Sequence, residues 1–199
     1  MGNIFYLMGK SSSGKDSIFQ ELLKDTQLNL KKAVLYTTRP IRAGEREGVT
    51  YHFTDEAALQ QLQMENKVIE VRGYETIQGM WYYFTVEDEQ FTHTKYDLLM
   101  IGTLESYGKM RERFGRQVIP IFIQVDDGQR LLRAVLREGK QEQPVYAEVC
   151  RRFLADEKDF SAEKLEENGI TEFFENRDLD TCVKEIKDFI KKRGMHNGH

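Results

Sequence analysis

Short apolar runs alternate along the chain with longer segments that are apolar on one side only. Three of the runs read as strands buried on both faces: residues 4–8, 98–101 and 118–125. A segment with helical periodicity follows each of them. Strands that alternate with helices predict a parallel central sheet joined by right-handed crossovers, so we expect an α/β fold.

The pattern changes between residues 36 and 92. Short β-like segments stand at 49–53, 68–71 and 81–84, with a short helix over 55–65. This part therefore predicts a small β-rich insertion in the larger α/β pattern. The remaining expected elements are a strand at 32–36, a helix at 145–160, a strand at 171–174 and a last helix capped by Asp178.

A glycine-rich segment joins the first strand to the first helix. It reads Gly9-Lys10-Ser11-Ser12-Ser13-Gly14-Lys15-Asp16, the pattern G-x-x-x-x-G-K of a phosphate-binding loop. Glycines let backbone N–H groups turn towards a phosphate, the helix N-terminus adds partial positive charge, and Lys15 adds a mobile cation. A Gly/Ser turn before an ordinary helix is the alternative. The flanking strand and helix favour a site for a nucleoside triphosphate.

The loop departs from the usual pattern at its last position. Ser or Thr there normally ligates Mg²⁺, and this chain has Asp16. A carboxylate beside a polyphosphate is repelled unless a cation lies between them. We predict that Asp16 contacts Mg²⁺ directly or through water, with Ser17 as the fallback ligand. The alternative is a first-turn acid favoured by the helix dipole.

A second polar segment, residues 36–53, contains arginines and a tyrosine at spacings suited to a single phosphate. Planar guanidinium groups bind phosphate oxygens bidentately, and Arg39 and Arg42 together with Tyr51 form such a donor set. Pro40 favours an extended backbone at Arg39, which helps to project its side chain. Arginines that are merely solvated are the alternative.

This segment resembles the nucleoside-monophosphate-binding segment of guanylate kinases, T-T-R-x-x-R-x-G-E-x-x-G-x-x-Y-x-F, at every fixed position. The resemblance extends weakly over nearly the whole chain and ends at 175–180, which is similar to the family's segment near the adenine of ATP. It implies a three-layer P-loop NTPase fold. The implied parts are a core (1–35, 93–132 and 153–199), a GMP-binding subdomain (36–92) and a helical lid (133–152).

The resemblance also implies site residues. Those expected at ATP are Gly9, Ser11, Ser12, Ser13, Gly14, Lys15, Asp16, Ser17 and Asn176. Those expected at GMP are Arg39, Arg42, Tyr51, Glu70, Tyr82 and Thr103. Those expected to be catalytic are Lys15, Arg39, Arg133, Arg137 and Arg152, with Arg151 as an alternative to Arg152.

Two of these positions bear on the choice of base. Glu70 accepts hydrogen bonds only, which fits the N1–H and N2 amino donors of guanine and not adenine; a surface glutamate on an edge strand is the alternative. Leu35 stands where the family has a base-contacting Ser, and Thr103 stands where it has an Asp. Guanine remains the expected base, with altered affinity or selectivity.

The lid arginines have a physical reason of their own. Phosphoryl transfer spreads negative charge over oxygens, and mobile cations stabilise that charge and exclude water. Arg133 and Arg137 lie one helical turn apart, so both can reach one ligand. A solvated basic face is the alternative.

The net charge and the cysteine count limit the classes of binding partner that we expect. The chain has 199 residues and a net charge of −4, which gives no reason to expect nucleic acid or a membrane. Two cysteines, Cys150 and Cys182, are expected to be reduced. We expect a cytoplasmic monomer or small homo-oligomer whose ligands are nucleotides.

The expected activity is ATP-dependent phosphorylation of GMP or dGMP, giving GDP and ADP, with Mg²⁺. One alternative is another nucleoside-monophosphate kinase on the same scaffold, because of Leu35 and Thr103. A second is a non-catalytic guanylate-kinase-like domain that binds a phosphopeptide. Such domains lose the phosphate loop, whereas Gly9, Gly14 and Lys15 are present here.

Overall fold

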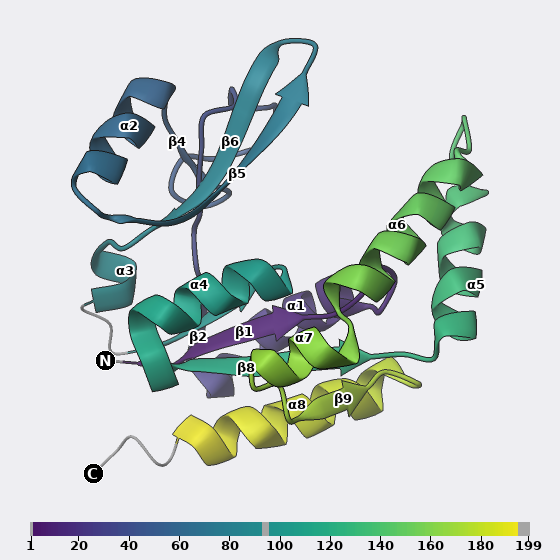
Figure 1. Cartoon of the computed structure of the whole chain (residues 1–199). Helices are drawn as coiled ribbons and strands as arrows, with labels where there is room; N and C mark the ends of the chain where they lie inside the picture. Colours follow the sequence, from purple (N-terminus) through teal and green to yellow (C-terminus); the bar gives the residue numbers. More distant parts are fainter. Residues whose placement is uncertain (1, 93–95, 195–199) are drawn as a thin grey trace.

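The computed structural model describes residues 2–92 and 96–194 and is built on a parallel five-stranded sheet (Figure 1). The strand order is β2-β7-β1-β8-β9, and each neighbouring pair is parallel. The strands are β1 (Ile4–Met8), β2 (Leu30–Lys32), β7 (Asp97–Ile101), β8 (Val118–Gln124) and β9 (Phe173–Glu175). The segment after β1 therefore leaves the middle of the sheet.

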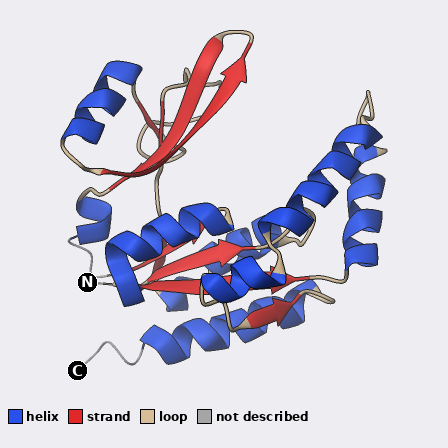
Figure 2. Cartoon of the chain, viewed as in Figure 1, coloured by secondary structure: helices blue, strands red, loops and turns tan. Residues whose placement is uncertain are grey.

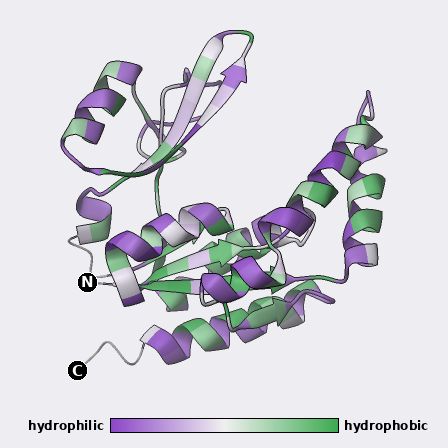
Figure 3. Cartoon of the chain, viewed as in Figure 1, coloured by the Kyte–Doolittle hydropathy of each residue, from purple (hydrophilic) through white to green (hydrophobic). Residues whose placement is uncertain are grey.

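Helices cover both faces of this sheet. α4 (Leu104–Phe114) packs on one face, and α1 (Lys15–Lys24) and α8 (Leu179–Gly194) pack on the other. Alternate residues of β1 enter the two cores, with Tyr6 in the first and Leu7 in the second. Figure 3 shows the apolar strands enclosed between amphipathic helices. The expected three-layer α/β fold with a parallel central sheet is confirmed.

A smaller sheet lies beyond one end of the central sheet and carries its own helix (Figure 2). Its strand order is β4-β3-β6-β5, from β3 (Tyr36–Thr37), β4 (His52–Phe53), β5 (Val68–Thr76) and β6 (Gly79–Val86). α2 (Glu56–Met64) covers one face through Leu59, which packs with Phe84 and Val86. Asp55 caps this helix by accepting from the Ala58 N–H at 2.8 Å. A short helix, α3 (Glu89–Thr92), follows β6.

Several expected strands differ from the structure. The run 32–36 is not one strand, because β2 ends at Lys32 in the central sheet and β3 begins at Tyr36 in the small sheet. Residues 33–35 instead connect the two sheets, and Ala33 is buried in the main core. The strands expected at 68–71 and 81–84 form a longer hairpin that includes Gly73, with a turn at residues 77–78. Cross-strand pairing extends both strands beyond their apolar centres.

Two long helices project from the other end of the central sheet as an antiparallel pair (Figure 1). These are α5 (Asp127–Glu138) and α6 (Tyr146–Asp159), which we call the helical hairpin. The chain returns through α7 (Ala162–Glu167), which the sequence did not predict, to β9 and α8. Two single-turn 3₁₀ helices stand at Thr26–Leu28 and Gly115–Gln117. In Figure 1 the small sheet and the helical hairpin both rise above the central sheet, the small sheet at the left of the view and the helical hairpin at the right.

Candidate active site

The phosphate loop is held in place by close packing of its backbone. A Cβ atom at Gly9 would lie 2.6 Å from the Ile123 carbonyl oxygen, and one at Gly14 would lie 2.4 Å from the Asn176 side-chain nitrogen. Gly14 has φ 87° and is the N-cap of α1. Asn176 is 4% exposed and donates from Nδ2 to the Ser13 carbonyl at 2.8 Å. The predicted ATP residue Asn176 thus lies against the loop and supports it.

Several groups in this loop have no partner among the residues that the structure describes. Ser12 is in the left-handed region with φ 62°, which costs a non-glycine residue about 1 kcal/mol or more. The hydroxyls of Ser12 and Ser13 are buried and make no hydrogen bond. Lys15 makes no ion pair within residues 2–92 and 96–194. A ligand rich in acceptor oxygens would satisfy these groups.

A cavity of about 580 Å³ lies beside the first turn of α1. It is bordered by the core, by the β5–β6 hairpin and by residues 36–53, which we call the arginine segment. Its lining includes Asp16, Phe19, Lys32, Leu35, Thr50, Tyr51, Arg72, Tyr74, Trp81, Tyr83, Met100 and Ile101. Its volume is within the range of small-molecule sites. Asp16 and Tyr51, predicted for different ligands, meet at this cavity.

Arg39 is buried beside the cavity and fixed by neighbouring groups. Its guanidinium donates to both oxygens of Glu45, at 2.7 and 2.5 Å, and from Nε to the Tyr83 hydroxyl at 3.0 Å. It also lies 5.2 Å from the centre of the Tyr51 ring. The hydrogen bonds from Arg39 lower the pKa of Glu45 to about 2. Arg39 is therefore pre-oriented by an ionised carboxylate.

The other predicted GMP residues do not all reach the cavity. Arg42 lies over the Trp81 ring at 5.7 Å. Tyr82 is on the opposite face of β6, where it packs with Leu59, and Tyr83 lines the cavity in its place. Tyr82 does not line this cavity, because alternate residues of a strand point to opposite faces, and its role at GMP stays a prediction.

Thr103 and Leu35 stand at positions where the resemblance implies polar contacts with the base. Thr103 is the N-cap of α4, and its hydroxyl accepts from the Ser106 N–H at 3.2 Å, so it does not line the cavity. Leu35 lines the cavity and offers only carbon atoms. Neither residue supplies the polar contact that the resemblance places at its position.

Glu70 is no surface side chain, although β5 is an edge strand. Its side chain is 7% exposed and accepts from Thr85 Oγ1 at 2.8 Å. Arg72, two residues along the same face, donates to it from Nε at 3.1 Å and from Nη2 at 3.4 Å. Arg72 lines the cavity, so the two form an ion pair at its wall.

Comparison with known proteins places this geometry in one family. A sequence model of guanylate kinase matches residues 1–193, which is nearly the whole chain. The chain belongs to the guanylate kinase family. A guanylate kinase from Mycoplasma mobile is 28% identical over 200 residues, covering 96% of this chain and 93% of that protein. One from Mycoplasmoides gallisepticum is 27% identical, again over 96% and 93%.

The fold agrees with this assignment. The crystal structure of guanylate kinase from Anaplasma phagocytophilum matches with a TM-score of 0.63 over 98% of this chain and 87% of that chain. The sequences are 20% identical, so this likeness speaks for the fold alone. No helix in the described parts of the chain is both long and apolar enough to cross a membrane.

The arginines of the helical hairpin divide between two cavities beside the phosphate loop. Arg137 and Arg152 line a small cavity of about 40 Å³ together with Ser11 and Ser12. Arg151 instead points to Glu148, donating to both carboxylate oxygens at 2.7 Å. The geometry therefore places Arg152, and not Arg151, beside the loop.

The remaining predicted ATP and catalytic residues lie nearby. Arg133 and Asn176 border a cavity of about 630 Å³, and Arg133 donates to the Asn176 carbonyl at 3.1 Å. Ser17 is exposed in the first turn of α1 beside Asp16. Burial raises the pKa of the Cys182 thiol to about 11, and both cysteines are free.

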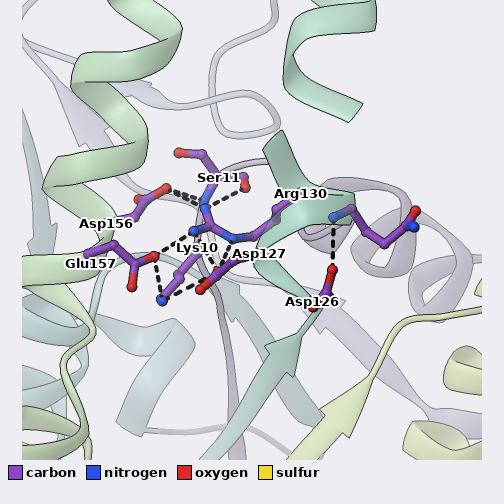
Figure 4. Close-up of polar contacts among 8 residues, drawn as sticks. Lys10, Ser11, Asp126, Asp127, Arg130, Asp156 and Glu157 are labelled. Atoms are coloured by element: carbon purple, nitrogen blue, oxygen red, sulfur yellow. Dashed lines mark hydrogen bonds and ion pairs between the residues drawn. The ribbon is translucent and has the colours of Figure 1, made fainter. Parts of the chain in front are cut away.

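An ionic cluster around the buried Arg130 joins the root of the helical hairpin to the phosphate loop (Figure 4). Arg130 is 1% exposed and donates to Asp127 at 2.9 Å, to Glu157 at 2.7 Å and to Asp156 at 3.1 Å. Asp156 also accepts from the Ser11 N–H at 2.8 Å. Lys10 pairs with Glu157 at 2.6 Å. We call these residues the hairpin-root cluster.

Sequence reasoning missed the cluster and three cavity residues. Tyr83, Trp81 and Arg72 could have been found from the alternation of β5 and β6, since their Cα register pairs Arg72 with Tyr83 and Tyr74 with Trp81. Arg130 looked like one more charge on an amphipathic helix. No local signal shows that its partners come from α6 and the phosphate loop.

Proposed function

We propose that this protein transfers the γ-phosphoryl group of ATP to GMP or dGMP, giving ADP and GDP. One observation carries the proposal. The 580 Å³ cavity is bordered both by the first turn of the phosphate-loop helix and by the arginine segment. Two phosphates bound at these places would meet near Asp16. Phosphoryl transfer needs such alignment more than it needs covalent catalysis.

Different sets of residues bind ATP, bind GMP and stabilise the transferred group. The loop amides, the Ser12 and Ser13 hydroxyls and Lys15 hold the ATP phosphates, while Asn176 supports the loop. Arg39, Arg42 and Tyr51 hold the acceptor phosphate, and Tyr83 takes the place given to Tyr82. Glu70 reads the N1–H and N2 amino edge of guanine. Arg133, Arg137 and Arg152 stabilise the charge that develops on the transferred group.

Mg²⁺ fits the residues beside the phosphate loop. Asp16 is exposed at the start of α1 and has no ion-pair partner within the described residues. When bound, the ion supplies charge neutralisation between the phosphates. Asp16 would hold it directly or through water, with Ser17 as the fallback ligand. Because the ligands are free nucleotides, we also propose that the protein acts in the cytoplasm.

A coupled assay of ADP formation with ATP, Mg²⁺ and each of GMP, dGMP, AMP, CMP and UMP tests the proposal. We expect turnover with GMP and dGMP and a large preference over the other three. Lys15→Met should lower kcat/KM by about 100-fold or more, since it removes the mobile cation. Lys24→Met, at the other end of the same helix, is the matched control, because Lys24 pairs only with exposed Glu21.

Two results would count against the proposal. Preference for another base would favour a different nucleoside-monophosphate kinase on this scaffold. No affinity for ATP by calorimetry, together with binding of a phosphopeptide, would favour a non-catalytic domain.

A further inference from the structure

Arg72, the partner of Glu70, is a charged group at the acceptor cavity to which the proposed function assigns no role. Arg72 donates to Glu70 from Nε and Nη2, the same edge of its guanidinium. Its other edge, formed by Nη1 and the second N–H of Nη2, has no acceptor within residues 2–92 and 96–194. Two coplanar donors therefore remain available at the cavity.

Arg72 lies nearer the cavity than Glu70 does. The Arg72 side chain is 31% exposed and lines the cavity, whereas the Glu70 side chain is 7% exposed and does not. The Thr85 hydroxyl donates a second hydrogen bond to the Glu70 oxygen Oε1. The carboxylate thus fixes the orientation of the guanidinium in the unliganded protein.

Gln20, Thr50, Tyr74 and Trp81 also bring polar groups to the cavity wall, but none of them carries two coplanar donor nitrogens. Leu35 is apolar, and the Tyr83 hydroxyl accepts from Arg39. Lys32 also lines the cavity, and burial lowers its pKa. Its ammonium is a single point charge without the planar pair of donor nitrogens that an arginine presents.

The two donors of Arg72 that do not contact Glu70 match a pair of acceptors on a purine base. Guanine and hypoxanthine present two coplanar acceptors, O6 and N7, which arginine binds bidentately. Adenine keeps N7 but has an amino donor at position 6, which would face an arginine donor. Two arginine donors at this cavity wall would therefore bind 6-oxopurines in preference to adenine.

We propose that Arg72, oriented by Glu70, donates to O6 and N7 of the acceptor base and is a specificity-determining residue. The inference rests on the proposed function, because it takes the cavity as the acceptor site. A carboxylate has about four acceptor sites, and Arg72 and Thr85 take three of those of Glu70, which leaves one for the N1–H or N2 donor beside the new arginine contact. The arginine contact also supplies polar recognition that Leu35 and Thr103 cannot.

Steady-state kinetics of Arg72→Met with GMP, IMP and AMP test the role. IMP lacks only the N2 amino group, so it shares O6 and N7 with GMP. We expect kcat/KM for GMP and IMP to fall together, by about 10- to 100-fold, mainly through KM, while AMP changes little. Arg46→Met is the matched control, since Arg46 is exposed on the same subdomain and its side chain has no partner in the described parts of the chain.

Arg72→Lys separates base reading from a structural ion pair. Lysine keeps a charge for Glu70, but one nitrogen cannot pair with the carboxylate on one side and present two donors to O6 and N7 on another. In Arg72→Lys the GMP-to-AMP preference should therefore stay as low as in Arg72→Met, while thermal unfolding matches that of the wild type. Restoration of the preference by lysine, or an unchanged GMP-to-AMP ratio in both variants, would overturn the role of Arg72 alone. Failure of the wild-type protein to phosphorylate GMP would refute the proposed function, and this inference with it.

Discussion

Single residues at the phosphate loop are held in states that a bound ligand would relieve. Ser12 has a left-handed backbone, and its hydroxyl and that of Ser13 are buried without partners. Strain and unsatisfied groups of this kind persist where the surrounding structure imposes them. Here the imposing groups are Asn176 on the Ser13 carbonyl and Asp156 on the Ser11 N–H. The loop is therefore preorganised for phosphate before any nucleotide binds.

Asp16 should make nucleotide binding depend strongly on Mg²⁺. In Asp16→Ser, we expect ATP affinity in EDTA to rise by about tenfold, because a like charge beside the phosphates is removed. Affinity with Mg²⁺ should not rise. Isothermal titration calorimetry with and without Mg²⁺ measures both. Glu21→Gln, in the last turns of the same helix, serves as the control, and an unchanged Mg²⁺ dependence would leave Asp16 only a first-turn acid.

At the scale of elements, the hairpin-root cluster connects three segments that are distant in the sequence. Arg130 comes from the first turn of α5, Asp156 and Glu157 come from the last turn of α6, and Lys10 and Ser11 come from the phosphate loop (Figure 4). Phe153 lies under the guanidinium at 4.4 Å. The base of the helical hairpin is thus tied to the loop, while its distal turns are exposed.

Arg130→Leu should destabilise the protein by about 3 kcal/mol or more. The change removes the buried partner of Asp156, whose side chain is 15% exposed, and leaves it close to half-exposed Asp127 and Glu157 with only Lys10 to pair the three carboxylates. Removing one partner of a largely buried ion pair is costly. Urea unfolding followed by circular dichroism measures the loss.

Arg151→Leu is the matched control for Arg130→Leu. It also breaks a bidentate arginine–carboxylate pair on the helical hairpin, but Arg151 is exposed. Its effect should be far smaller. Equal losses in the two variants would show that burial of Arg130 contributes nothing.

At the scale of the whole molecule, the residues that we propose for one reaction lie on separate parts. The arginine segment and β5–β6 hairpin belong to the small sheet, Lys15 belongs to the core, and Arg137 and Arg152 belong to the helical hairpin. In Figure 1 the small sheet and the helical hairpin stand apart above the central sheet. Transfer between two bound nucleotides requires water to be excluded from between these parts.

We expect the small sheet and the helical hairpin to approach each other when both nucleotides bind. Dyes at Ile77→Cys, on the fully exposed tip of the β5–β6 hairpin, and at Gln143→Cys would report the approach in a Cys150→Ser background. Energy transfer should rise with GMP plus a non-hydrolysable ATP analogue, and less with either one alone. Equal signals with and without both nucleotides would show that the parts do not close.

The sequence by itself determined the contiguous features. Strand, glycine loop and helix form one local unit, and the arginine segment carries its donors within a few residues, so both were predictable from spacing. The buried parallel strands were predictable because each is apolar on both faces. These features depend on neighbours along the chain, and local chemistry suffices to identify them.

Only the tertiary structure decided between neighbouring residues and joined distant ones. Strand register placed Tyr83 at the cavity instead of Tyr82, and helix rotation placed Arg152 beside the loop instead of Arg151. The pairing of Arg72 with Glu70 and the burial of Arg130 depend on which surfaces meet. A charge on an amphipathic pattern looks solvated until another element covers it, because burial is a property of the packed chain.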